Sequence, residues 1–583
     1  MSMADILDEW HKEALQIQTY LNECIQQIPI DTETWVLAIL ILALSSVFLG
    51  AIYLDLVISP VLITANKDTI QIKHRLDKDG IQHSISLRDF IERFVPSLAT
   101  SKKAVYLPTP YLFNGHLQTI YAALVAQPRK AGKSDDVKYE RDIVEMPDGG
   151  VIALDWYPTC ADSIPKETPI LFVTHGLTGG SHETYVSELV SVFSSAPYYY
   201  RTVVCNFRGC AGSDVLTPQL YCAAYTDDVK HIVQTIQSRF PDAPMVATGF
   251  SLGANVLSKY VGETGEDCPF LSAVSVGNPL NLVIGSETLE GGWFSRNVYS
   301  YRMAIGKAFR DDTTTFVLTE VLVAGLVSLF RPHMHLFEDH PDIDLKAVLS
   351  SGSVREFDAQ LTAKCFGFSS VDEYYRLGSS STYVPKISIP CLFIHALDDP
   401  IVNPKAIPRE EIIKNPCCLL VTTKSGGHLG WFEGTWRPKR WQTKPIAQYL
   451  NAIIQAHRSL PLSQRRKIPS PRVYGLAAAH ILNDSLLDHV PALAEPFSTT
   501  KSSSPKQSNK VVEGILSKPT TNGAIVPKPK SVVAKTSSRF HPSLSQALLP
   551  KGPSLLMTLL RQLGVVAVVF ALMGWIRRRS KWM

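Results

Sequence analysis

Short apolar runs recur through the middle of the chain, and each of them ends in a turn signal. Continuous runs of β-branched residues, without alternation, are typical of strands buried on both faces of a parallel sheet. Helix-like stretches such as 224–240 and 254–261 separate the runs. The pattern predicts an α/β fold with a mostly parallel central sheet and helices on both faces. The six runs are 169–180, 201–213, 243–255, 270–279, 389–400 and 417–428.

The longest uncharged apolar segment lies near the N-terminus. It runs from Trp35 to Leu54 and has 20 residues, enough for a helix to span a bilayer core. We expect a transmembrane helix at 35–54 after an N-terminal tail at 1–34; a buried core helix is the alternative. Only Lys12 precedes the segment, whereas five basic residues follow it, which predicts a cytosolic downstream domain. These five are Lys67, Lys73, Arg75, Lys78 and Arg88.

A second apolar segment lies at the C-terminal end. Residues 563–576 are apolar, and extending the segment back to 555 gives 22 residues that include Arg561 and Gln562. The segment 555–576 fits a tilted span or an interfacial membrane anchor, and because the basic run 577–579 prefers the cytosolic face, an anchor or a hairpin is favoured over a full crossing. Residues 458–552 are rich in Ser, Pro and Lys, which predicts a mostly disordered linker.

These limits leave 110–457 as the predicted folded domain, with 55–109 as a connecting segment. About 110 residues separate the run that ends near Pro279 from the run that starts near Ile389. Counted with the strands expected before residue 169, these two runs are strands 6 and 7 of the sheet. An insertion here, at about 280–388, is expected to form a cap over the active site. Its apolar stretch from Phe316 to Phe330 either faces an acyl chain or packs on the sheet as a core helix.

Composition excludes several classes of function. The chain of 583 residues has 57 Lys and Arg against 53 Asp and Glu, a net charge of +4, which gives no sign of nucleic-acid binding. Its ten cysteines include no Cys-x-x-Cys pair, which indicates reduced thiols rather than a disulfide framework. No zinc-ligand spacing occurs, and no metal or organic cofactor is expected.

The segment "GFSLG" places Ser251 between a predicted strand and a predicted helix. This is the context of a nucleophile elbow, in which a sharp turn exposes the serine hydroxyl. Gly249 and Gly253 are expected because a Cβ at either position would clash with the crossing strand and helix. The helix N-terminus adds amide groups and a partial positive charge where a negative oxygen would form.

A serine nucleophile needs a base and an orienting acid. His428 follows the last predicted strand in "SGGHLGW", and Asp399 follows the preceding strand in "LDDP", with Asp398 as the alternative acid. The order Ser, Asp, His is that of α/β-hydrolases. An oxyanion hole needs two backbone N–H groups, which are expected from Leu252, after the nucleophile, and Leu177 in "THGLTGG".

The chain resembles the AB-hydrolase-4, or YheT-like, family of α/β-hydrolases, and within it the branch of fungal medium-chain fatty acid ethyl ester synthases/esterases and monoacylglycerol lipase-like members. The resemblance spans most of 106–457. The matching stretches are "NGHLQT" (114–119), "HGLTGGSHETYV" (175–186), "NFRGCAGS" (206–213), "GFSLGAN" (249–255), "LDDP" (397–400) and "GGHLGW" (426–431).

This resemblance implies a serine esterase that acts on medium-chain acyl esters, with Ser251, Asp399 and His428 as its triad. Acyl transfer from acyl-CoA to an alcohol in place of water would be a second outcome. A monoacylglycerol lipase or phospholipase is the nearest alternative, and a non-catalytic membrane-bound lipid-binding protein is the alternative of another class. The endoplasmic reticulum, lipid droplets and the mitochondrial outer membrane all fit the apolar ends.

Overall fold

The structure is a computed structural model that describes residues 58–75, 82–102, 104–125, 137–159, 163–290, 311–435 and 437–465. The predicted transmembrane helix at 35–54, the anchor at 555–576 and nearly all of the linker at 458–552 lie outside these residues. Among the helices that the structure describes, none combines the length and the apolar character needed to cross a membrane.

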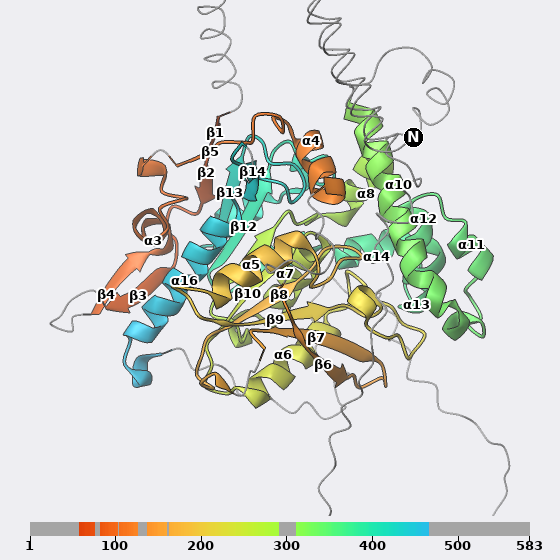
Figure 1. Ribbon diagram of the computed structural model, residues 1–583, viewed down its shortest axis with the longest axis horizontal. Coiled ribbons are helices and arrows are strands. Elements are labelled where there is room, and N and C mark those ends of the chain that lie inside the picture. The colour runs from red at the N-terminus through yellow and green to blue at the C-terminus, as the bar shows by residue number, and fades with distance from the viewer. Residues whose placement is uncertain are drawn as a thin grey trace, which may run out of the picture.

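A central sheet of nine strands organises the molecule (Figure 1), in the order β2-β13-β12-β11-β10-β8-β9-β7-β6. The six strands from β13 to β9 are parallel, and β7, β6 and β2 are antiparallel to their neighbours at the edges. All six predicted runs contain one of the parallel strands, which confirms the mostly parallel sheet. The parallel strands are β8 (Ile170–Thr174), β9 (Arg201–Asn206), β10 (Met245–Phe250), β11 (Ala273–Val276), β12 (Cys391–Ala396) and β13 (Cys418–Thr423).

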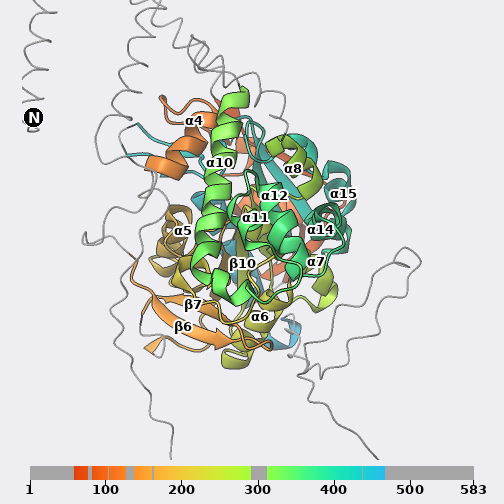
Figure 2. The ribbon, with the colours of Figure 1, turned by 90° about the vertical axis from the view of Figure 1, so that its right-hand side faces the viewer.

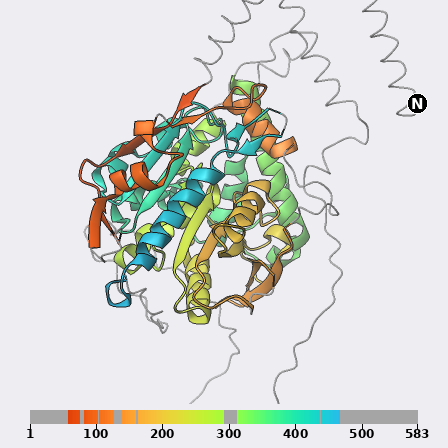
Figure 3. The ribbon, with the colours of Figure 1, turned by 60° about the vertical axis from the view of Figure 1, so that its left-hand side comes forward.

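Helices cover both faces of the sheet because its strands are apolar on both sides. In β10, Val246 and Phe250 belong to one apolar cluster, whereas Met245 and Ala247 belong to another. The first cluster contains helices α3 (Leu87–Phe94), α5 (Thr184–Ser194) and α16 (Thr443–Ser459), and α16 crosses this face in blue in Figure 3. The second contains α6 (Asp227–Arg239), α7 (Leu252–Thr264) and α15 (Arg409–Lys414).

The described residues of the segment 55–109, expected to be a connecting segment, take part in the folded body. Strand β2 (Leu62–Ala65) pairs antiparallel with β13, and α3 packs into the first apolar cluster. Strands β1 (Ser59–Pro60) and β5 (Val105–Tyr106) form a short antiparallel ribbon, as do β3 (Gln71–Arg75) and β4 (Gln82–Ser86). The predicted start at residue 110 therefore falls inside the fold. The sheet is completed by β6 (Glu140–Glu145) and β7 (Val151–Tyr157).

The insertion between β11 and β12 forms a helical layer beside the sheet (Figure 2). It has its own apolar core, in which Phe330, Phe337 and Phe357 pack with Val215 and Leu220 from the main body. The C-terminal half of α10 packs mainly within this cap, through Val323, Leu326 and Phe330, while Leu329 also contacts the apolar cluster of the sheet. The helices are α8 (Leu282–Glu290), α10 (Asp311–Phe330), α11 (Leu345–Leu349), α12 (Val354–Phe357), α13 (Ala363–Cys365) and α14 (Val371–Gly378).

Candidate active site

Ser251 occupies a strained turn between β10 and α7. Its backbone has φ +52° and ψ −122°, a conformation that side chains other than glycine rarely adopt. Such a residue costs about 1–3 kcal/mol and persists only where its surroundings enforce it. The Ser251 N–H donates to the carbonyl of Val276 (2.9 Å), which fixes the turn against the neighbouring strand. The strain holds the Ser251 hydroxyl clear of α7 behind it.

The glycines on either side permit this turn. An ideal Cβ on Gly249 would lie 2.6 Å from Cα of Ala254, in the first turn of α7. One on Gly253 would lie 2.3 Å from the carbonyl oxygen of His175, at the end of β8. Both distances are shorter than non-bonded contacts allow, so any side chain here would push the helix off the sheet. The expected physical role of Gly249 and Gly253 matches this geometry.

The structure brings His428 and Asp399 to Ser251. His428 Nε2 lies 2.8 Å from Ser251 Oγ, and His428 Nδ1 lies 2.8 Å from Asp399 Oδ2. The two side chains are 10% and 2% exposed, so the imidazole contacts the carboxylate away from bulk water. Since a carboxylate accepts the bond at Nδ1, Nδ1 carries the proton and Nε2 is free to accept from the serine hydroxyl.

The adjacent carboxylates Asp398 and Asp399 have different partners. Asp399 Oδ1 accepts the N–H groups of Ile401 (2.8 Å) and Val402 (2.9 Å), which orients Oδ2 toward His428. Asp398 turns to the backbone of the histidine loop, where its Oδ1 accepts the N–H of Gly427 (2.9 Å). Burial raises the pKa of Asp398 to about 6 although backbone N–H groups oppose the shift. The structure therefore places Asp399, and not Asp398, beside the imidazole.

The loop after β8 presents a backbone amide beside the serine. The N–H of Gly176 donates to the Tyr185 hydroxyl (3.0 Å), and the N–H of Thr178 donates to the Tyr221 hydroxyl (2.8 Å). Between them, the N–H of Leu177 donates to no protein group within the described residues, and the same is true there of Leu252. The two amides expected from sequence are thus available to an incoming oxygen. The tyrosines that fix the loop escaped sequence analysis.

His175 holds the same loop from below. It is buried, and its Nε2 accepts the N–H of Phe207 (3.1 Å), so its Nδ1 carries the proton and donates to the carbonyl of Gly176 (2.8 Å). Burial lowers the pKa of His175 to about 4, which keeps the ring neutral at physiological pH. His175 is therefore a fixed support of the loop and no candidate for proton transfer.

Helix α4 (Gly115–Ile120) supports the histidine loop from the other side. Thr119 Oγ1 accepts the backbone N–H of His428 (2.8 Å) and donates to the carbonyl of Gly115 (2.7 Å). An ideal Cβ on Gly115 would lie 2.0 Å from the carbonyl oxygen of Asp398, so only glycine allows this approach. The side chain of Asn114 caps the helix by accepting the N–H of Leu117 (2.9 Å). The "NGHLQT" stretch, noticed only through resemblance, thus positions His428.

Replacing Thr119 with valine is expected to lower kcat for ester hydrolysis about tenfold, with little change in KM. The substitution removes one hydrogen bond, which costs about 1 kcal/mol, and the imidazole of His428 is then held less firmly. Thr119→Ser should restore kcat because the hydroxyl returns. Thr235→Val is the matched control, since Thr235 Oγ1 also bonds a carbonyl four residues earlier, that of His231, but on α6. Equal kcat losses in both valine variants would show a general folding effect instead.

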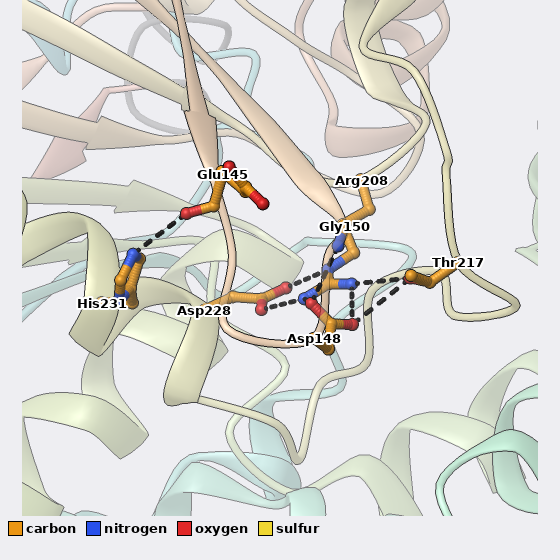
Figure 4. A network of polar contacts seen from close by, with 7 residues as sticks. All are labelled: Glu145, Asp148, Gly150, Arg208, Thr217, Asp228 and His231. Atoms are coloured by element: carbon orange, nitrogen blue, oxygen red, sulfur yellow. Dashed lines mark hydrogen bonds and ion pairs between the residues drawn. The ribbon is translucent and has the colours of Figure 1, made fainter. Parts of the chain in front are cut away.

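Two arginine–carboxylate networks, each with at least one buried partner, fix the loops behind the site. Arg208, from the "NFRGCAGS" stretch, forks onto Asp228 (2.8 and 2.7 Å) and Asp148 (2.5 and 3.0 Å), as Figure 4 shows. Burial opposes the charge of Arg208, but the hydrogen bonds to both carboxylates outweigh it and raise its pKa. This pairing ties the β6–β7 turn to the start of α6.

The second network joins β7 to the loop after β8. Asp155 accepts two bonds from Arg141 (2.7 Å each), one from Asn206 (2.9 Å) and one from the hydroxyl of Ser181 (2.5 Å). Both networks hold loops that adjoin the site and touch none of its three polar groups. Throughout the described part of the chain, no group of three His, Cys, Asp or Glu residues is arranged to hold a metal ion.

Known proteins resemble this chain over the part that carries the site. A family model described as the alpha/beta hydrolase fold matches residues 169–435. The monoacylglycerol lipase of Saccharomyces cerevisiae is 30% identical over 459 residues, 72% of this chain and 96% of the lipase. The human phospholipase ABHD3 is 31% identical over 62% of this chain and 82% of its own length. The yeast medium-chain fatty acid ethyl ester synthase/esterase 2 is 30% identical over 63% of this chain and 90% of its own.

Proposed function

The chain belongs to the α/β-hydrolase family and is a hydrolase of that family, and from this premise we propose that it is a membrane-associated serine esterase of medium-chain fatty acyl esters. The observation that carries the proposal is the hydrogen-bonded series from Ser251 Oγ through His428 to Asp399, with 2.8 Å at each step. It stands on a strained turn that presents the serine hydroxyl.

In the first half of the proposed reaction, Ser251 Oγ attacks the carbonyl carbon of the ester as His428 Nε2 takes its proton. Asp399 holds the imidazole in the required tautomer and stabilises it once both nitrogens carry protons. The tetrahedral oxygen accepts the N–H groups of Leu177 and Leu252, each worth a few kcal/mol in the transition state. Collapse breaks the ester bond, and His428 returns the proton to the leaving alcohol.

In the second half, an acceptor attacks the acyl group on Ser251. His428 takes the acceptor's proton and delivers it to Ser251 Oγ as the acyl bond breaks. Water as the acceptor releases a fatty acid, and an alcohol as the acceptor releases a new ester. With acyl-CoA as the donor, the first half releases the thiol of coenzyme A. No metal or organic cofactor takes part in these steps.

The cap supports an apolar acyl group. The side chain of Leu177 packs against the cap cluster around Phe330 and Phe357, and that of Leu252 packs against the cluster around Tyr374 and Tyr375. If the ester carbonyl binds between the amides of Leu177 and Leu252, the acyl chain of the substrate would therefore extend toward apolar cap residues. The names of the yeast relatives, which specify a medium-chain ethyl ester and a monoacylglycerol, favour the same class.

Membrane association is proposed from the apolar segments at 35–54 and 555–576, with the folded body, which the structure describes from residue 58, and its cap facing the cytosol. A membrane-held enzyme meets esters that partition into lipid. Monoacylglycerol lipase or phospholipase activity is the alternative that two of the relatives' names favour. Acceptance of acyl-CoA or an alcohol belongs to the same acyl-enzyme chemistry.

The test uses the full chain and p-nitrophenyl esters from acetate to palmitate, with monoacylglycerol and phosphatidylcholine as natural competitors. We expect kcat/KM to be highest from hexanoate to decanoate, and a fluorophosphonate to attach to Ser251 with loss of activity. Added ethanol should divert product from fatty acid to ethyl ester. Attachment of the probe elsewhere, or no hydrolysis of any ester by folded protein, would overturn the proposal; preference for a natural competitor would select the lipase alternatives.

A further inference from the structure

The ribbon formed by β1 and β5 is apolar on its outer face. From Ile58 to Leu62 the residues alternate strictly between exposed and buried, and Ile58, Pro60 and Leu62 are the exposed ones. The partner strand alternates in the same way, with Val105 and Leu107 exposed. The register pairs exposed Pro60 with exposed Val105, and buried Ser59 with buried Tyr106. The ribbon therefore presents apolar side chains outward where strands normally present polar ones.

Two exposed aromatic residues follow the ribbon in the short segment between β5 and α4. Tyr111 and Phe113 are each 50% exposed, which is similar to the exposed fractions of Leu62 (53%) and Leu107 (47%). Six of the eleven large apolar side chains that are exposed among the described residues lie within 58–113. Scattered exposed apolar residues are ordinary, but a gathered set indicates an interaction surface. We define this surface, the ribbon face, as Ile58, Pro60, Leu62, Val105, Leu107, Tyr111 and Phe113.

The sequence before the ribbon says what covers it. The uncharged segment 35–54 ends four residues before Ile58. Four residues of fully extended chain reach at most about 14 Å. The polar headgroup zone on each side of a bilayer is roughly 5–8 Å thick. If 35–54 spans the membrane, Ile58 therefore lies within or next to the headgroup zone, where Tyr and other aromatic residues favour the interface.

We propose that the ribbon face rests in the headgroup region of the membrane and holds the neighbouring loop that carries His428 near the lipid surface. This inference rests on the proposed membrane-associated esterase and names the surface that meets the lipid. Basic residues adjoin the face in sequence, at Lys67 and at 102–103, where they attract anionic lipid. The bilayer, and not a second copy or the C-terminal segment, is the proposed occupant of the ribbon face. The reason is that the apolar segment 35–54 ends only four residues before Ile58.

The segment that follows β5 is bonded to β14 (Phe432–Glu433) and Gly434, which come directly after the histidine loop. Pro108 and Glu433 form an isolated antiparallel β-bridge. Next to it, the N–H of Thr109 donates to the carbonyl of Phe432 (2.8 Å), and the hydroxyl of Thr109 donates to the carbonyl of Gly434 (2.6 Å). Strand β5 accordingly lies near β14 in Figure 1. These bonds couple the position of the ribbon face to that of the histidine loop, so docking of the face would bring His428 toward the lipid.

Depth in the bilayer tests the contact itself. The full chain is reconstituted in phosphatidylcholine–phosphatidylserine vesicles with an environment-sensitive fluorophore on Leu107→Cys, and nitroxide-bearing lipids act as quenchers. The matched control is Ile143→Cys, because Ile143 is a strand residue with 53% exposure outside the ribbon face. The unsubstituted chain gives the label background. We expect at least fivefold stronger quenching at position 107 than at 143; equal quenching would overturn the proposal.

Activity tests the consequence. Leu62→Ser with Leu107→Ser is expected to lower hydrolysis of a vesicle-borne decanoyl ester roughly tenfold. Hydrolysis of dissolved p-nitrophenyl butyrate should stay unchanged, because neither residue touches the site. The control pair Ile143→Ser with Leu216→Ser replaces residues of 53% and 57% exposure and should alter neither rate. Equal loss on both substrates, or no loss on the vesicle ester, would contradict the docking role.

The two proposals fail in different ways. A chain that hydrolyses no ester but is quenched at position 107 contradicts the esterase and leaves the membrane contact standing. A chain that hydrolyses esters without quenching at 107 contradicts the contact alone. Protection of the 107 label without lipid, by dimers or by the C-terminal segment, would also overturn the lipid assignment.

Discussion

Replacing Ser251 with alanine is expected to lower kcat for p-nitrophenyl octanoate by about 10⁶-fold, the scale of a lost nucleophile. The variant lacks the oxygen that His428 Nε2 contacts at 2.8 Å, so no acyl-enzyme forms. The leucine amides and the cap remain, so KM should change only a few-fold and some rate above that of water should persist. Stopped assays with long incubation measure the low kcat. After treatment with the fluorophosphonate probe, mass spectrometry should find no phosphonate attached to the Ser251→Ala chain.

Ser258→Ala is the matched control on the same helix. Ser258 Oγ lies 3.0 Å from Ser275 Oγ within the buried face of α7, two turns from Ser251. Its loss should cost about 1 kcal/mol of stability, seen as a lower Tm, with kcat unchanged. A Ser251→Ala chain that keeps the unsubstituted kcat would contradict the assignment of the nucleophile. Equal kcat losses in both variants would point to disturbed folding of α7.

The parallel strands were predictable because each is buried on both faces. A run such as 169–180 carries no alternation, so its sequence alone indicates a strand covered by helices. Strand β2 offers no such signal, because its four residues pair with a single neighbour, β13, about 350 positions along the chain. A short edge strand is stabilised by its partner rather than by its own pattern. The expected connecting segment at 55–109 thus differs from the structure for a tertiary reason.

The positions of the site residues were predictable to the level of the strand ends. In a parallel sheet the carboxyl ends of the strands meet at one edge, which places the residues after β10, β12 and β13 together. The support of the site was not predictable in the same way. Thr119 meets the backbone of His428 across 309 positions, and Tyr185 and Tyr221 meet glycine-loop amides through their hydroxyls. Such contacts follow from packing and leave no local pattern.

Replacing Asp399 with asparagine is expected to lower kcat about 10⁴-fold with KM changed only a few-fold. The amide group keeps the volume of the carboxylate, but its N–H₂ end can face His428 Nδ1. The imidazole would then carry its proton on Nε2 and could no longer accept one from Ser251. Steady-state kinetics with p-nitrophenyl octanoate measure the loss, and Tm shows whether the bonds from Ile401 and Val402 hold the loop.

Asp398→Asn is the control one residue away, and it separates the two carboxylates that sequence analysis left open. Asp398 bonds the N–H of Gly427 and not the imidazole, and an asparagine oxygen can accept the same bond. Because burial already raises the pKa of Asp398 to about 6, a neutral amide at this position is a mild change. We expect kcat to fall about tenfold at most. A larger loss in Asp398→Asn than in Asp399→Asn would reverse the roles assigned to the pair, because only the acid that orients His428 controls its tautomer.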